Sequence, residues 1–121
     1  MSYKKQKLPF DKKGGVIVIP RPMIESDRYG SLSAQAKVLM LYMQSHWKNT
    51  VAVGFGVREA AKRIPCAKGT AQNAFRELVN AGFIVMVEES LFNSRTQSKS
   101  RTWRLTWLPY MDAQPTRDWA N

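Results

Sequence analysis

Two stretches of the sequence are rich in side chains that bind anions and form hydrogen bonds with nucleic acid. Residues 68–76 combine an amine, a hydroxyl, two carboxamides and a guanidinium, in Lys68, Thr70, Gln72, Asn73 and Arg76. Residues 90–104 contain no acid, and their cationic residues are Arg95, Lys99, Arg101 and Arg104. Lysine and arginine neutralise phosphate, and a carboxamide can donate to and accept from one adenine. The chemistry that these residue types favour is recognition of a polyanion.

The sequence offers little for catalysis or for a metal ion. It has one histidine, His46, and one cysteine, Cys66, so a metal site built from these residue types has too few ligands. A Cys–His nucleophilic pair is conceivable, but we expect Cys66 to be buried as a small hydrophobic residue. Gly54-Phe55-Gly56 lacks the third glycine of a dinucleotide-binding fingerprint, and the sequence contains no phosphate-loop motif. We therefore expect neither an enzyme nor a bound cofactor.

The net charge narrows the possible partners. Nineteen Lys and Arg against nine Asp and Glu give the 121-residue chain a formal charge of +10, which attracts nucleic acid or an anionic membrane. No stretch approaches the roughly 18 apolar residues of a membrane span, and the basic residues do not follow one amphipathic helix. The lone Cys66 fits a reducing compartment, and the basic N-terminus is not followed by the long apolar segment of a secretory signal. These features predict a cytoplasmic protein without a membrane role.

Hydrophobic spacing predicts the elements that carry the two polar stretches. A helix is expected from Ser33, its N-cap, to residues 46–49, followed by a short strand at 51–53 that Gly54 and Gly56 end. A second helix should begin near Val57 and stop at Pro65. A third should run from about residue 68 to Gly82, where a left-handed residue can end it. Strands are expected at 83–87 and 101–107, with a polar loop between them.

Three regions follow from this reading. Residues 1–21 form a basic arm and a short extended segment, 22–109 a single domain, and 110–121 a tail whose Tyr110 and Trp119 could dock on the domain. The arm is either a solvated tail or a DNA-contacting arm through five lysines, Lys4, Lys5, Lys7, Lys12 and Lys13. Trp103 and Trp107 alternate on one strand face and are expected in the core, as are Met40 and Met43.

Several segments resemble a known family. They are Val57-Arg58-Glu59-Ala60-Ala61, Lys68-Gly69-Thr70-Ala71-Gln72-Asn73-Ala74-Phe75-Arg76-Glu77-Leu78 and Ala81-Gly82-Phe83-Ile84. They resemble bacterial and phage winged helix-turn-helix proteins, including MarR-type and GntR-type regulators and the DNA-binding domains of phage and plasmid replication initiators. Leu32-Ser33-Ala34-Gln35-Ala36-Lys37 and Trp103-Arg104-Leu105-Thr106-Trp107-Leu108-Pro109 look like small proteins of mobile elements. The resemblance implies an α+β, mainly α fold: a winged helix-turn-helix of three helices and a β-hairpin wing.

The resemblance also implies roles for the polar residues. In such proteins the second helix of the motif enters the major groove. Gln72 and Asn73 would then read base edges. Contacts with the DNA backbone would come from the remaining polar positions, Lys68, Gly69, Thr70, Arg76, Arg95, Lys99 and Arg101.

Two positions depart from the family pattern. Pro65 stands where the turn usually has glycine, and Ala67 stands at the N-cap, where it can accept no N–H. Either a bound phosphate satisfies the open N–H groups, or the helix start frays.

Duplex DNA binding by a nucleoid-associated protein is the function that follows, in transcriptional regulation or in replication initiation of a phage or mobile element. The alternative is a winged helix that binds protein and inhibits or modulates a host nucleic-acid machine. Self-association stays open beside either function.

Overall fold

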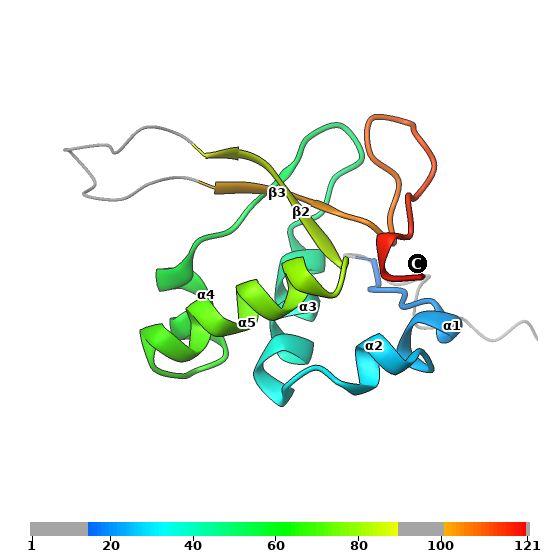
Figure 1. Ribbon diagram of the computed structural model, residues 1–121. Helices are drawn as coiled ribbons and strands as arrows, with labels where there is room; N and C mark the ends of the chain where they lie inside the picture. The colour runs from blue at the N-terminus through cyan, green and yellow to red at the C-terminus, as the bar shows by residue number, and fades with distance from the viewer. Residues whose placement is uncertain (1–14, 90–100, 121) are drawn as a thin grey trace, which may run out of the picture.

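A computed structural model describes residues 15–89 and 101–120 and has an α+β fold, as predicted (Figure 1). Within these residues the helices are α1 (Arg21–Ile24), α2 (Asp27–Gly30), α3 (Ala34–Ser45), α4 (Val57–Arg63) and α5 (Lys68–Asn80). The strands are β1 (Val53–Gly54), β2 (Ile84–Glu89) and β3 (Arg101–Leu105), and a short 3-10 helix, η2 (Asp118–Ala120), lies near the C-terminus. More of the described chain is helical than extended, which also agrees with the prediction.

Helix α3 begins and packs as its sequence predicts. The Ser33 hydroxyl accepts a hydrogen bond from the backbone N–H of Ala36 at 3.1 Å, so Ser33 is the expected N-cap. The residues at helical spacing face the core and are buried: Ala36, Leu39, Met40 and Met43. The helix ends at Ser45, one residue before the predicted range.

Helix α5 is the second long helix and packs across α3 and α4. Its buried stripe is the predicted one: Ala71, Ala74, Phe75 and Leu78. Gly82 follows the helix with φ +83°, the left-handed conformation expected of a helix stop. A Cβ at Gly82 would also lie 2.8 Å from the Asp118 carbonyl carbon, so glycine is required there for a second reason.

The strands form one antiparallel sheet in the order β1-β3-β2. Trp103 of β3 lies between Val53 of β1 and Met86 of β2. The first strand begins two residues later than predicted and ends one residue later, because Gly54 pairs with Thr102 and extends the strand that we expected it to end. The predicted alternation is confirmed within β3, where Trp103 and Leu105 are buried, but the strand ends at Leu105 and not at residue 107. Trp107 is buried as expected, and so is Thr106 beside it, so the alternation does not continue past the strand.

Sequence periodicity missed the two helices before α3, because each has only four residues. Local signals were nevertheless present. Pro22 lies in the first turn of α1, and the Ser26 hydroxyl caps α2 by accepting from the Tyr29 N–H at 3.2 Å. Met23 of α1 is buried in the core, so this region belongs to the folded unit.

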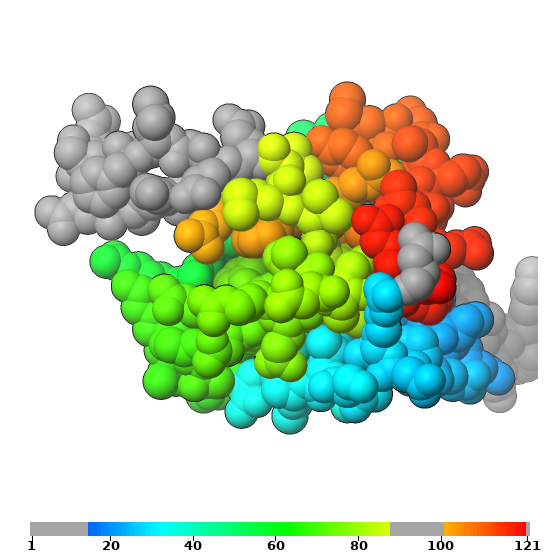
Figure 2. Space-filling model, viewed as in Figure 1, coloured from blue at the N-terminus to red at the C-terminus, as the bar shows by residue number. Residues whose placement is uncertain are grey.

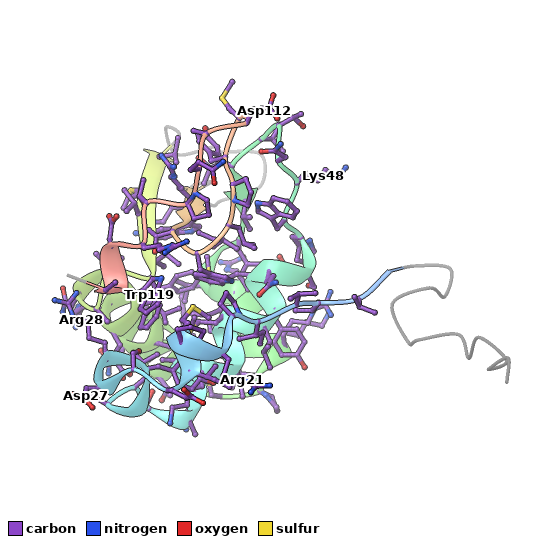
Figure 3. The ribbon with its side chains drawn as sticks, turned by 90° about the vertical axis from the view of Figure 1, so that its right-hand side faces the viewer. Arg21, Asp27, Arg28, Lys48, Asp112 and Trp119 are labelled. Atoms are coloured by element: carbon purple, nitrogen blue, oxygen red, sulfur yellow. The ribbon has the colours of Figure 1, made fainter. Side chains whose placement is uncertain are left out.

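The ends of the described chain differ in how they pack. We expected residues 16–19 to lie against the domain, but only Ile19 contacts the core, and Val16, Ile17 and Val18 are exposed. The C-terminal residues do dock: the Trp119 ring stacks on Phe83 at 6.2 Å between centroids. Figure 3 labels Trp119 and Arg28 on the same side of the molecule, where Arg28 donates to the carbonyl of Asp118 at 3.1 Å.

The three internal tryptophans each combine packing with a hydrogen bond. Trp103 Nε1 donates to the Phe55 carbonyl at 3.0 Å, and Trp107 Nε1 donates to Gln44 Oε1 at 3.1 Å. Trp47 Nε1 donates to the Pro109 carbonyl at 3.1 Å. Trp103 and Trp107 are therefore core residues, as predicted, with their polar atoms satisfied. No helix of the described residues has both the length and the apolar character needed to cross a bilayer.

Candidate nucleic-acid interface

The outer face of α5 presents the polar residues that the sequence singled out. Because Ala71, Ala74, Phe75 and Leu78 turn inward, the positions between them turn outward. Five of the six predicted contact residues on this helix are exposed, and Thr70 is half-buried: Lys68, Gly69, Gln72, Asn73 and Arg76 are the exposed ones. The structure thus brings these residues together on one solvent-facing surface, which we call the α5 face.

One hydrogen bond distinguishes the two carboxamides of the α5 face. Arg76 Nη1 donates to Asn73 Oδ1 at 3.2 Å, three residues apart on the helix. The Asn73 oxygen is therefore engaged in the free protein, whereas its amide N–H groups can still donate. In the described part of the chain the Gln72 carboxamide has no such partner, and both of its functions face solvent.

The acid of α5, Glu77, lies at the edge of the α5 face and is bonded to the start of α3. Glu77 Oε1 accepts from the backbone N–H of Ser33 at 2.8 Å, and Glu77 Oε2 accepts from the Ser33 hydroxyl at 2.7 Å. This carboxylate fixes the start of α3 against the end of α5. Since residues 68–76 contain no acid, the α5 face has cationic and neutral polar side chains alone. Sequence reasoning did not assign this role to Glu77.

Helix α4 adds cations beside α5. Arg58, Lys62 and Arg63 are exposed on it. Glu59 lies 3.9 Å from Arg63 Nε and 3.8 Å from His46 Nε2, both ion-pair distances at exposed positions. His46 therefore faces a carboxylate. Cys66, which we expected to be buried, is only half-buried against the core, because it lies in the short connection between α4 and α5.

The start of α5 has the open N-cap that the sequence predicts. Ala67 has the extended backbone of a cap, with φ −65° and ψ 152°, but it offers no side-chain acceptor. The first backbone N–H groups of α5 are thus left without the side-chain oxygen that Ser33 supplies to α3.

The hairpin of β2 and β3 extends toward the same end of the molecule as the N-terminus of α5 (Figure 1). In Figure 2 the residues of α4 and α5, in green, form the lower left of the surface below this hairpin. Arg101 begins β3 and is half-buried. The other predicted basic contacts lie outside the described residues: Arg95, Lys99, Lys4, Lys5, Lys7, Lys12 and Lys13.

A surface hollow lies between α2 and the C-terminal part of α5. Its lining includes Arg28, Glu77 and Asn80. Asp27 also lines it. Arg28 donates to two carbonyls, and Glu77 accepts from Ser33, so two of its four charged or amide groups already hold the fold together. Within the described residues no group of three His, Cys, Asp or Glu is arranged to hold a metal ion.

Comparison with known proteins gives no further guide to the site. No family model matches the chain, and no curated protein or solved structure matches it at a significant level.

Proposed function

We propose that this protein is a winged helix-turn-helix protein that binds double-stranded DNA, with α5 in the major groove. The observation that carries the proposal is the α5 face, where Lys68, Gln72 and Arg76 are exposed without an acid among them. Such a surface combines cations for phosphates with a carboxamide for base edges. Transcriptional regulation and replication initiation for a phage or mobile element both use this duplex DNA binding. Neither role requires the protein to be an enzyme.

The order of elements supports the winged-helix assignment. A helix, a short strand, two helices joined by a short connection and a β-hairpin follow one another as α3, β1, α4, α5, β2 and β3. In a helix-turn-helix the second helix of the pair reads the groove, and α5 occupies this position. The formal charge of +10 supplies long-range attraction to the duplex.

The free-state hydrogen bonds rank the two candidate base readers. A bidentate contact with adenine needs both the oxygen and the amide of a carboxamide. Asn73 must first release Arg76, whereas Gln72 is ready to make both bonds. Gln72 is therefore the principal base-reading residue in our proposal. Asn73 instead orients the Arg76 guanidinium toward the DNA backbone.

The experiment is a titration of each variant against a selected duplex and a scrambled duplex at several salt concentrations. Gln72→Ala should reduce the preference for the selected duplex by about 1–3 kcal/mol, as expected for loss of one bidentate contact. Asn80→Ala, at the other end of α5, is the matched control and should bind like wild type. Equal loss in both variants would contradict the assignment of the reading surface.

Cationic positions give the complementary result. Lys68→Ala, Arg95→Ala and Lys99→Ala should weaken binding to both duplexes alike, because phosphate contacts carry no sequence information. Each lost contact should make the log–log salt slope shallower by about one. If none of these variants differs from wild type, neither the α5 face nor the basic residues between β2 and β3 meet DNA, and binding of a host protein becomes the better explanation.

A further inference from the structure

Strand β2 leaves one backbone edge of the sheet open. It is the outer strand in the order β1-β3-β2, and within the described residues no backbone hydrogen bond joins its far side. The Thr106 N–H donates to the Phe83 carbonyl, so alternation of the ladder directs the backbone groups of Ile84 and Met86 to the open edge.

The side chains along this edge are apolar and accessible. Val85, Met86 and Val87 are 40%, 43% and 46% exposed. Natural edge strands are commonly protected by lysine or proline, and Ile84–Val87 contains neither. The bulge between Met86 and Glu88 falls at Val87, so the regular part of this edge is Ile84–Met86. The edge is therefore suited to accept one more strand.

A second unpaired segment lies near the N-terminus. Val16, Ile17 and Val18 are 44%, 46% and 66% exposed and consist entirely of β-branched residues. Within the described chain the backbone of this segment makes one hydrogen bond, from Gln44 Nε2 to the Val18 carbonyl at 2.7 Å. β-branched residues favour strands in a pleated, half-buried sheet, but in the described part of one molecule this segment pairs with no strand.

The segment and the open edge lie on different sides of one molecule. In Figure 3 the blue N-terminal segment runs out on one side, and the yellow-green strand β2 lies toward the other. Figure 1 places the same segment away from the hairpin of β2 and β3. Pairing between them therefore requires two copies of the chain.

We propose that residues 16–18 of one copy add to the open β2 edge of a second copy as an antiparallel strand. In this register Val18 lies opposite Val85, and Ile17 lies opposite Met86. The direction follows from charge, because Lys12 and Lys13 precede the segment in the sequence, and Glu88 and Glu89 end β2. Antiparallel pairing brings the basic and acidic ends together, whereas parallel pairing separates them.

The resulting association is head to tail. One copy offers its segment and the next offers its edge, so the two surfaces in contact are different, and each copy keeps a second site open. This inference concerns a surface other than the α5 face and goes beyond the proposed DNA binding. Both experiments below use the full chain without DNA, so their failure leaves the DNA-binding proposal unaffected.

Sedimentation velocity over a range of protein concentrations tests the association. The wild-type weight-average mass should rise above the 13.8 kDa of one chain as concentration increases. Val18→Lys and Val85→Lys should each stay at the monomer mass, because each places a charge in the new strand pair. Met111→Lys adds the same charge at a 63% exposed position elsewhere and should associate like wild type. A wild-type protein that remains monomeric, or a loss of association in all three variants, would overturn the proposal.

Disulfide trapping tests the register. In a Cys66→Ala background, Val18→Cys and Val85→Cys proteins are mixed and oxidised with oxidised glutathione, which takes up the two electrons and protons of the thiols. Facing residues of a non-hydrogen-bonded antiparallel pair lie about 4.5 Å apart at Cα, which a disulfide can bridge. The mixed dimer should form in clear excess over the dimer from Val85→Cys with Met111→Cys. Equal yields of the two would overturn the register and the proposed pairing.

Discussion

The two helices that directly precede β1, α2 and α3, begin in a different way from the two that follow it, α4 and α5. We call these two pairs the first and the second region. Helices α2 and α3 each start at a serine whose hydroxyl accepts a backbone N–H, Ser26 for α2 and Ser33 for α3. Helices α4 and α5 start at Gly56 and Ala67, which supply no side-chain bond. The first region is therefore capped by its own side chains, and the second leaves its first N–H groups without a side-chain partner, as α1 also does after Pro20. Natural sequences commonly accept such local weakness where a surface has a function to serve.

The start of α3 is also held by a residue from α5. Glu77 accepts two hydrogen bonds from Ser33, while Ser33 caps α3. A carboxylate of the second region thus stabilises the capped start of α3 in the first.

The largest effect is expected from Glu77→Ala. A hydrogen bond to a charged group contributes about 1.5–3 kcal/mol, so loss of both bonds should lower the free energy of unfolding by about 2–3 kcal/mol. Urea unfolding followed by circular dichroism measures this change. Glu59→Ala is the control, because its ion pairs are exposed and should contribute about 0.5 kcal/mol or less. Equal effects at both glutamates would remove the basis of the comparison.

Ser33→Ala should have the next largest effect. It removes both the N-cap hydroxyl and the bond that this hydroxyl donates to Glu77, which should together cost about 1–2 kcal/mol of stability, and the folded variant should bind duplex DNA like wild type. Ser45→Ala, at the exposed end of α3, removes a hydroxyl that donates to the Tyr42 carbonyl and should change stability by much less. A drop in DNA affinity for fully folded Ser33→Ala would show that the α3 start acts on the α5 face.

Ala67→Ser should act in the opposite direction. The backbone angles of Ala67, −65° and 152°, nearly match the −66° and 160° of Ser33, so a serine there can cap without rearrangement. We expect a gain of about 1 kcal/mol in the free energy of unfolding. If a phosphate binds the open N–H groups of α5, the new hydroxyl competes with it, and affinity for every duplex should fall. Tighter binding by Ala67→Ser would indicate that the helix start is simply frayed in wild type.

The sequence predicted the features that depend on periodicity and on single residues with distinct chemistry. The spacing of Leu39 and Met43 located α3, and Gly82 located the end of α5. It could not reveal contacts between distant residues, such as Glu77 with Ser33 or Arg28 with the Asp118 carbonyl. Helices α1 and α2 were not predicted, because four residues are too few for a helical period to be recognised.

The same limits apply to the candidate site. Side-chain direction on α5 follows from the helical period, which is why the exposure of Gln72 and Asn73 was predictable. The bond from Arg76 to Asn73 was not, because several rotamers of each side chain are compatible with the sequence. That bond is the reason for ranking Gln72 above Asn73 as the base reader.

The smallest effect is expected from Gly69→Ala, and it separates stability from binding. Gly69 lies in the first turn of α5, and an added Cβ would meet no atom within 4 Å, so alanine fits without strain. Lower backbone entropy in the unfolded chain should raise the free energy of unfolding by about 0.5 kcal/mol. In the proposed binding mode the added methyl group would stand between the helix start and the phosphate backbone, so DNA affinity should fall. Gly30→Ala, at the end of α2, also meets no atom within 4 Å and serves as the matched control, with a similar stability gain and unchanged affinity. If Gly69→Ala leaves binding as unchanged as Gly30→Ala does, the open start of α5 is not in contact with DNA, and the difference between the two regions has another cause.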